Sequence, residues 1–257
     1  MLANPDVRFL NQLAALSEDL ILKEHAAAAA KMQGRCEVPE NESHPGCSDR
    51  VLGILKDYIS TAYPEHTVYD HSPDASEDKF VWSVDVFNTE QLSERGLPAK
   101  GVSAGLSHRG KSVAGMVVRP FTRERFWAEG AEALTFGPLG QFRLNTRRNI
   151  QLHQSIMHVS DDDCFDEVTR KGIQSLSSRV LMTRQGDPCH AMTMLAAGYI
   201  DLCIIHPDRM SALSPLILLV KNARGCVTEL SGQYAGYLAS SGPVLHAEIL
   251  RVLNSAK

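Results

Sequence analysis

The chain has 257 residues, of which 44% are hydrophobic and 22% are charged, and its formal net charge is -4 at pH 7. This is the composition of a globular protein, long enough for one large domain or two small ones with a sizeable core. It has no dense run of lysine and arginine, which argues against nucleic acid as a partner. The longest apolar stretch, residues 212–220, is too short to span a membrane, and the first residues do not resemble a secretory signal. We therefore expect a cytoplasmic protein with no nucleic-acid or membrane partner.

The six cysteines are scattered along the chain, and no two of them form a Cys-x-x-Cys pair. This spacing excludes a zinc knuckle, and a disulfide framework is not expected in a chain of this length. We interpret the cysteines as small buried or half-buried thiols.

The first half of the chain predicts helices followed by antiparallel sheet. Residues 5–33 have the apolar spacing of a helix, and residues 49–64 form a second amphipathic helix that Pro64 ends. Residues 80–87, "FVWSVDVF", are expected to form a buried strand. In residues 101–130, strand-like runs flank the turn signal "HRGK", which predicts a hairpin or meander.

The second half predicts an alternation of helices and strands. Residues 160–178 are expected to form a helix, because Ser160 stands at a cap position and three aspartates follow in the first turn. The later elements, in chain order, are a strand at 179–183, a helix at 189–200, a strand at 201–205, a helix at 212–223, strands at 225–230 and 236–241, and a helix at 242–255. This order predicts an α+β protein of stacked layers, one compact unit with sub-domains at 1–140 and 141–257.

Five segments resemble, in order and at compatible spacing, motifs of the inositol monophosphatase superfamily. They are "WSVDVFNTEQLSERGLP", "VSAGLSHRGKSVAGMVVRPFTRERFWAE", "TRQGDPCHAMTMLAAGYIDLCI", "NARGCVTELSGQ" and "LASSGPVLHAEIL". The wording is closest to the bacterial histidinol-phosphate phosphatase branch. The likeness covers about residues 49–253 and implies the α-β-α-β-α sandwich of inositol monophosphatase and fructose bisphosphatase.

The resemblance implies a magnesium-dependent phosphomonoesterase, whose acids hold metal ions that activate water and stabilise charge on the phosphoryl oxygens. In such proteins, a strand ends in W-x-x-D-P-x-D-G-T. Asp85 matches the first aspartate of this motif, whereas Asn88 stands at the second and lacks its charge. The G-T pair is replaced by Thr89 and Glu90, and a carboxylate at this place would repel a bound phosphate.

The other two expected metal ligands are also changed. Ala212 stands where the family has an aspartate that opens a helix, and Ser211 replaces the aromatic residue beside it. The loop glutamate of the family falls near His71. Because Mg²⁺ requires hard oxygen ligands in near-octahedral geometry, we expect metal-dependent hydrolysis to be lost or lowered by several orders of magnitude.

The changed motif still forms a polar set of candidate site residues. The catalytic candidates are Asp85, Glu90 and His71, and Asp85 is also a weak candidate metal ligand. The substrate-binding candidates are Asn88, Thr89, Asp187, His206, Arg209 and Ser211. Structural roles remain open for several of them: Asn88 can cap a turn, and Asp187, directly before Pro188, can be a helix N-cap.

Three hypotheses follow from these residues. The chain is a divergent protein that binds or transforms a small polar metabolite in the former active-site cleft, an active phosphatase with an altered metal set, or a pseudoenzyme that acts through protein contacts. The first predicts no secure cofactor, and Mg²⁺ enters under the second. The expected partners are a small polar or phosphorylated metabolite and, because relatives commonly form dimers, a second copy of the chain.

Overall fold

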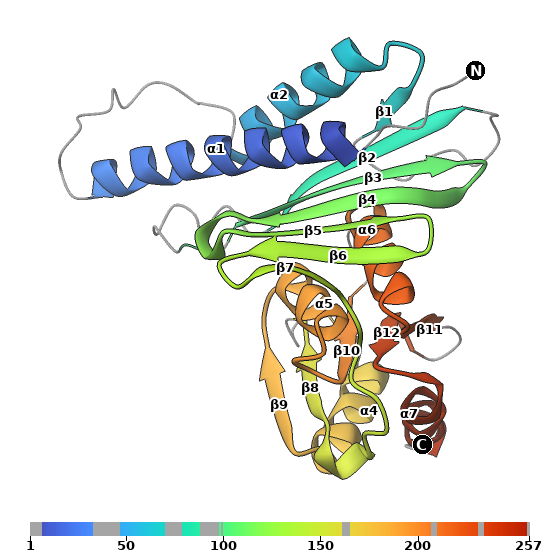
Figure 1. Cartoon of the computed structure of the whole chain (residues 1–257). Coiled ribbons are helices and arrows are strands. Elements are labelled where there is room, and N and C mark those ends of the chain that lie inside the picture. Colours follow the sequence, from blue (N-terminus) through green and yellow to red (C-terminus); the bar gives the residue numbers. More distant parts are fainter. Residues whose placement is uncertain are drawn as a thin grey trace.

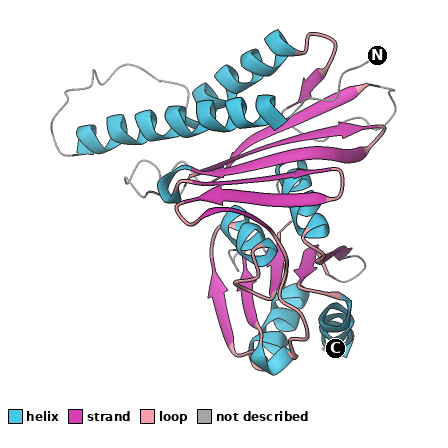
Figure 2. Ribbon diagram, viewed as in Figure 1, coloured by secondary structure: helices cyan, strands magenta, loops and turns pink. Residues whose placement is uncertain are grey.

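The structure, a computed structural model, describes residues 7–32, 47–69, 79–87, 98, 100–160, 165–206, 210–230 and 234–255. Two β-sheets and three groups of helices are stacked on one another (Figures 1 and 2). The N-terminal helices α1 (Val7–Met32) and α2 (Cys47–Ala62) form the first layer, close to the predicted ranges. They pack on the first sheet through side chains that include Phe9, Leu13 and Trp82.

The first sheet has seven strands in chain order, and neighbouring strands are antiparallel except β1 and β2. The strands are β1 (Thr67–Tyr69), β2 (Phe80–Phe87), β3 (Gly101–His108), β4 (Lys111–Arg119), β5 (Glu124–Glu129), β6 (Glu132–Gly137) and β7 (Gly140–Arg143). The predicted hairpin is confirmed: Arg109 and Gly110, with φ of 51° and 71°, form the tight turn between β3 and β4. Sequence patterns missed β1, β6 and β7.

The second sheet has the strand order β11-β12-β10-β8-β9. Its strands are β8 (Ile156–Val159), β9 (Met182–Gln185), β10 (Leu202–Ile205), β11 (Cys226–Leu230) and β12 (Gly236–Ser240). Strands β8, β9 and β10 are parallel, so their carboxyl ends lie at one edge of the sheet. Strand β12 is antiparallel to β10, and its carboxyl end therefore lies at the opposite edge.

Two helices, α5 (Pro188–Ala196) and α6 (Met210–Asn222), fill the space between the sheets. Close packing of α6 on the first sheet depends on glycine, because a Cβ on Gly115 would lie 2.8 Å from Cβ of Pro215 in α6. Gly105 lies almost as close to the same proline. The last layer, α4 (Glu167–Ser177) and α7 (Pro243–Ser255), packs on the other face of the second sheet. The predicted five-layer sandwich is confirmed.

The predicted start of the helix at residues 160–178 is wrong. Helix α4 begins at Glu167, and its N-cap is Asp166, whose Oδ1 accepts a hydrogen bond of 2.8 Å from the N–H of Thr169. Ser160 instead accepts a hydrogen bond from the N–H of His206, which joins the ends of β8 and β10. Residues 161–164, which include the three aspartates, lie outside the described residues.

Strand β9 begins three residues later than predicted, and α5 ends four residues earlier. Gly198, with φ of 79°, follows the end of α5. Three cysteines have described side chains, and all three are free thiols: Cys189 and Cys203 are buried and Cys226 is half-buried, as expected. In the described parts of the chain, none of the helices has the length and apolar character needed to cross a membrane.

Candidate functional site

A pocket of about 260 Å³ lies beside the carboxyl ends of β8 and β9, and we call it the cleft pocket. It is bounded by the start of β3, the turn between β4 and β5, and the N-terminus of α5. Its charged and imidazole side chains are Lys100, Arg119, His158, Arg184, Asp187 and His190. Three of them are permanently cationic at neutral pH and one is a carboxylate, so the pocket favours an anionic ligand.

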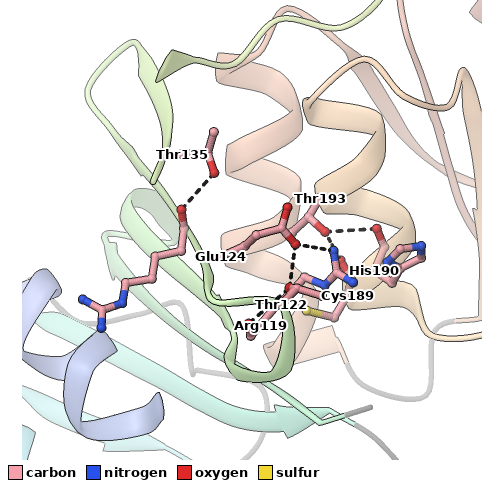
Figure 3. A network of polar contacts seen from close by, with 8 residues as sticks. Arg119, Thr122, Glu124, Thr135, Cys189, His190 and Thr193 are labelled. Carbon is pink, nitrogen blue, oxygen red and sulfur yellow. Dashed lines mark hydrogen bonds and ion pairs between the residues drawn. The ribbon is translucent and has the colours of Figure 1, made fainter. Parts of the chain in front are cut away.

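The guanidinium of Arg119 is held in place by the turn that follows β4. Its Nη1 lies 2.9 Å from Oε2 of Glu124, and the hydroxyl of Thr122 donates to the same carboxylate oxygen at 2.6 Å (Figure 3). Arg123, with φ of 54°, closes this turn and allows Glu124 to return beside Arg119. Because the ion pair uses one of five N–H donors, Arg119 is oriented and keeps donors for a ligand.

Asp187 forms the N-cap of α5, which confirms its predicted structural role. Its Oδ1 accepts a hydrogen bond of 2.7 Å from the N–H of Cys189, and Pro188 occupies the first turn. One turn further along, the hydroxyl of Thr193 donates to the carbonyl oxygens of Cys189 and His190 (Figure 3). These contacts fix the start of α5, and with it the position of His190 at the pocket.

His190 is held in its neutral form. Burial lowers its pKa to about 4, and the positive charge of Arg119, the nearby His158 and Arg184 act in the same direction. The ring centres of His158 and His190 are 6.1 Å apart. At neutral pH, His190 therefore presents a neutral imidazole beside fixed cations, suited to hydrogen bonding with a ligand hydroxyl.

Cys189 lies under the same pocket wall but is not an activated thiol. Its side chain is fully buried, and burial, followed by the charge of Asp187, raises its pKa well above the ordinary value. The sulfur packs against the start of β3, where a Cβ on Gly101 would lie 3.0 Å from it. Because nucleophilic cysteines need an accessible thiolate, Cys189 has a packing role.

The described residues place three of the predicted site residues around this region. Asp187 lines the cleft pocket. Asp85 lies near the end of β2, where its Oδ1 accepts from the N–H of Val86, and its charge acts on Cys189. His206 follows β10 and packs edge-on against Phe165, with ring centres 5.2 Å apart; it is not among the residues that line the cleft pocket.

The remaining predicted site residues cannot be placed as side chains. Ser211 lies in the first turn of α6, as does Ala212, but their side chains are not described. His71, Asn88, Thr89, Glu90 and Arg209 lie outside the described residues. The roles of all these residues stay predictions.

Sequence analysis missed four of the basic residues in the pocket: Lys100, Arg119, His158 and Arg184. The sequence held a signal for Arg184, which lies in the segment "TRQGDPCHA" three residues before Asp187. His158 lies on β8, a strand of four residues that was not predicted. Lys100 is 5% exposed, and burial of a lysine cannot be recognised in the sequence.

No three His, Cys, Asp or Glu side chains of the described residues are grouped so that they could hold a metal ion. Asp85 is among the described residues, the predicted ligand positions His71 and Asn88 are not, and Ala212 has no side chain that could bind a metal ion. A site for Mg²⁺ needs several hard oxygen ligands together, and the described residues alone do not supply that set.

Similarity to known proteins identifies the family of the chain. The model of the Inositol monophosphatase family matches residues 21–257, and the chain belongs to this family. Its fold is shared with an inositol monophosphatase from Zymomonas mobilis, with a TM-score of 0.79 and 15% identity over 97% of each chain. Mycobacterium tuberculosis SuhB also shares it, with a TM-score of 0.76 and 19% identity over 96% of this chain and 94% of that one.

Two relatives show how distant the similarity in sequence is. The bifunctional phosphatase IMPL2, chloroplastic, of Arabidopsis thaliana is 26% identical over 189 residues, which are 70% of this chain. The chain covers about half of that relative, 53% of its length. A fructose-1,6-bisphosphatase/inositol-1-monophosphatase of Thermotoga maritima is 22% identical over 207 residues, 78% of each protein.

Proposed function

We propose that this chain binds a small phosphorylated metabolite in the cleft pocket and has lost magnesium-dependent hydrolysis of phosphomonoesters. The observation that carries the proposal is the charge of the pocket, in which Lys100, Arg119 and Arg184 outnumber Asp187. In a metal-dependent phosphatase, bound cations neutralise the phosphate. Here, side-chain cations line the pocket themselves, and the acids that would hold metal ions are replaced at Asn88 and Ala212.

The pocket residues divide naturally between binding and positioning. Arg119 and Arg184 bind phosphate oxygens, because a guanidinium donates two parallel N–H groups to such a group. Neutral His190 accepts a hydrogen bond from a hydroxyl on the organic part of the ligand. The carboxylate of Asp187 caps α5 and so positions His190 without contacting the phosphate.

The proposed loss of hydrolysis is supported by the described lining residues, none of which is a group that activates water at neutral pH. A metal ion would lower the pKa of bound water and stabilise the leaving oxygen, a contribution of several kcal/mol. His190, with a pKa of about 4, is too weak a base to replace it at neutral pH. The substrate pocket of the family would then serve as a binding site.

An active phosphatase with an altered metal set is the second candidate. Two relatives, from Arabidopsis thaliana and Thermotoga maritima, are named as phosphatases, and this chain belongs to the Inositol monophosphatase family. Such an enzyme would use His71, Asp85 and Asn88 as ligands and take an inositol phosphate or histidinol phosphate. Whether the chain forms a homodimer is a separate prediction that sedimentation of the purified protein would answer.

The test measures metal content and phosphatase activity on the same purified sample. Inositol phosphate, histidinol phosphate and an aryl phosphate are each assayed with Mg²⁺ and with Mn²⁺. We expect no turnover above that of an Asp85→Ala variant. Turnover that requires metal and disappears in Asp85→Ala would overturn the loss of hydrolysis and favour the second candidate.

Binding is measured separately, by calorimetric titration with myo-inositol 1-phosphate. We expect binding in the wild type, weaker binding in Arg184→Gln, and unchanged binding in Arg179→Gln. Arg179 is the matched control, because it is an exposed arginine whose side chain has no ion pair with another described residue. Equal affinities in the two variants would remove the cleft pocket from the proposal, whatever the phosphatase assay shows.

A further inference from the structure

A second pocket, of about 450 Å³, lies at the opposite edge of the second sheet, and we call it the arginine pocket. It is formed by residues 146–151, which precede β8, by Arg224 after α6, and by residues 241–245, which join β12 to α7. These segments adjoin the amino ends of β8 and β10 and the carboxyl end of β12. The cleft pocket adjoins the carboxyl ends of β8 and β9, so the two pockets are separate.

Three arginines line this second pocket: Arg147, Arg148 and Arg224. Arg147 is anchored, because its Nε lies 3.4 Å from Oδ1 of the fully buried Asp201. Arg148 and Arg224 form no ion pair or hydrogen bond through their side chains with the other residues that the structure describes. The pocket therefore holds two cations whose charge is not neutralised by the described part of the protein.

Helix α7 adds a second feature that favours an anion. It has 13 residues and begins at Pro243, with Val244 and Leu245 in its first turn beside the arginines. The N–H groups of a first helical turn have no acceptor within the helix and carry the positive end of its dipole. Guanidinium groups and such N–H groups together are the usual donors to phosphate.

The same pocket has an apolar part. Ile150 and Val244 line it, and the side chain of Val244 is 80% exposed. A valine this exposed at the mouth of a pocket can gain from contact with an apolar group on a ligand. The lining thus matches a molecule with a phosphate at one end and an apolar body at the other.

Arg224 occupies a helix-terminal position at which glycine would be less strained. It has φ of 70° and follows α6 at the position where helices commonly place glycine; the N–H of Gly225 after it donates to the carbonyl of Val220. A non-glycine residue there costs about 1 kcal/mol. Asn149, also at positive φ, lines the same pocket.

We propose that the arginine pocket is a second binding site, for a small phosphorylated molecule with an apolar body. Arg148 and Arg224 bind the phosphate oxygens, the first turn of α7 complements the charge, and Ile150 and Val244 contact the apolar body. This site does not depend on the function proposed for the cleft pocket. Its occupant is a ligand in addition to the metabolite bound there.

The test uses 1-naphthylmethylphosphonate, which has a doubly charged phosphonate at mildly alkaline pH, an apolar ring and no ester bond to hydrolyse. Calorimetric titrations are made in an Arg184→Gln background, which weakens the cleft pocket. One double variant adds Arg224→Gly, and a second adds Arg251→Gln. Arg251, in the last turns of α7, is exposed and provides the same change of net charge outside the pocket.

We expect the Arg184→Gln protein to bind the phosphonate, and the Arg224→Gly addition to weaken this binding at least about fivefold, because a charge-assisted contact is lost. The Arg251→Gln addition leaves it unchanged, and uncharged 1-naphthalenemethanol binds more weakly than the phosphonate. Because glycine suits the backbone at residue 224, the Arg224→Gly protein remains folded. No binding in the Arg184→Gln background, or a loss below fivefold, overturns the proposal.

Discussion

The cleft pocket and the arginine pocket both present cations at an edge of the second sheet, but they hold these cations differently. In the cleft pocket, Arg119 is paired with Glu124, and Lys100 and His158 are almost fully buried, whereas Arg184 is exposed. In the arginine pocket, Arg148 and Arg224 are exposed and unpaired among the described residues. Preorganised groups lose little conformational entropy when a ligand binds, whereas long exposed side chains must first be ordered. The charges of exposed side chains are also screened by salt. We therefore expect tighter and more selective binding in the cleft pocket.

Helix α6 packs on α5 and β4, which border the cleft pocket, and it ends two residues before Arg224 in the arginine pocket. The helix is held against the first sheet where Gly115 meets Pro215. The largest expected effect is therefore that of Gly115→Ala, whose added Cβ would lie 2.8 Å from one atom of Pro215 and 3.0 Å from its Cα. Overpacking of this kind costs about 1–3 kcal/mol of unfolding free energy.

Urea unfolding measures this loss, and titrations with the two ligands test whether both pockets change together. The control is Gly53→Ala on α2, where an added Cβ meets no atom within 4 Å and alanine favours the helix. Equal stability of the two variants would show that contact with Gly115 does not position α6.

The second expected effect is a loss of ligand affinity in one pocket and not in the other. Arg184→Gln removes a cation from the cleft pocket and is expected to weaken binding of myo-inositol 1-phosphate by about tenfold, the loss of one charge-assisted contact. Affinity of the arginine pocket for 1-naphthylmethylphosphonate stays the same. A parallel loss at both pockets would show that they are coupled. Raising the salt concentration is expected to weaken the arginine pocket more, because both of its unpaired cations are exposed, whereas Lys100 and Arg119 of the cleft pocket are buried or paired.

The third expected effect is an increase in stability rather than a loss. Arg224→Gly relieves a left-handed backbone conformation and is expected to stabilise the fold by up to about 1 kcal/mol, while ligand affinity in the arginine pocket falls. Thermal unfolding measures the gain, and Arg251→Gln is the control for net charge. A stability equal to or below that of the wild type would mean that Arg224 makes contacts that offset its strain.

The sequence could predict features that local patterns encode, but not the residues that meet in the two pockets. Local patterns predicted most helices and the meander of β3 to β5, because hydrophobic period and turn residues are local properties. The five-layer fold was implied by the resemblance to the inositol monophosphatase superfamily. Short strands such as β8 and β9 carry little pattern, so His158 was missed and Arg184 was not recognised as a pocket residue. Ser160 and the following aspartates have the sequence pattern of a helix start, but the N-cap of α4 is Asp166. Arg148 and Arg224 meet because segments distant in sequence adjoin the same sheet edge, which no local pattern encodes.

The smallest expected effect is the dependence of stability on His190. Burial lowers its pKa from 6.5 to about 4 in the folded protein, so between these values the unfolded chain binds more protons. Stability is therefore fully present above pH 6.5 and is lost as the pH falls toward 4. After allowance for solvent screening, we expect a loss of about 1 kcal/mol, or about 2–4 °C in the melting temperature.

The measurement compares the melting temperature of the wild type with that of His190→Gln over this pH range. Buried His66 and His246 also have lowered pKa values, but both remain in the variant, so the difference between the two proteins reports His190. Parallel curves would show that His190 titrates normally. Because a phosphate bound in the cleft pocket would favour the charged imidazole, saturation with myo-inositol 1-phosphate should reduce the difference. Ligands of the arginine pocket should leave it unchanged, since that pocket lies at the other edge of the sheet.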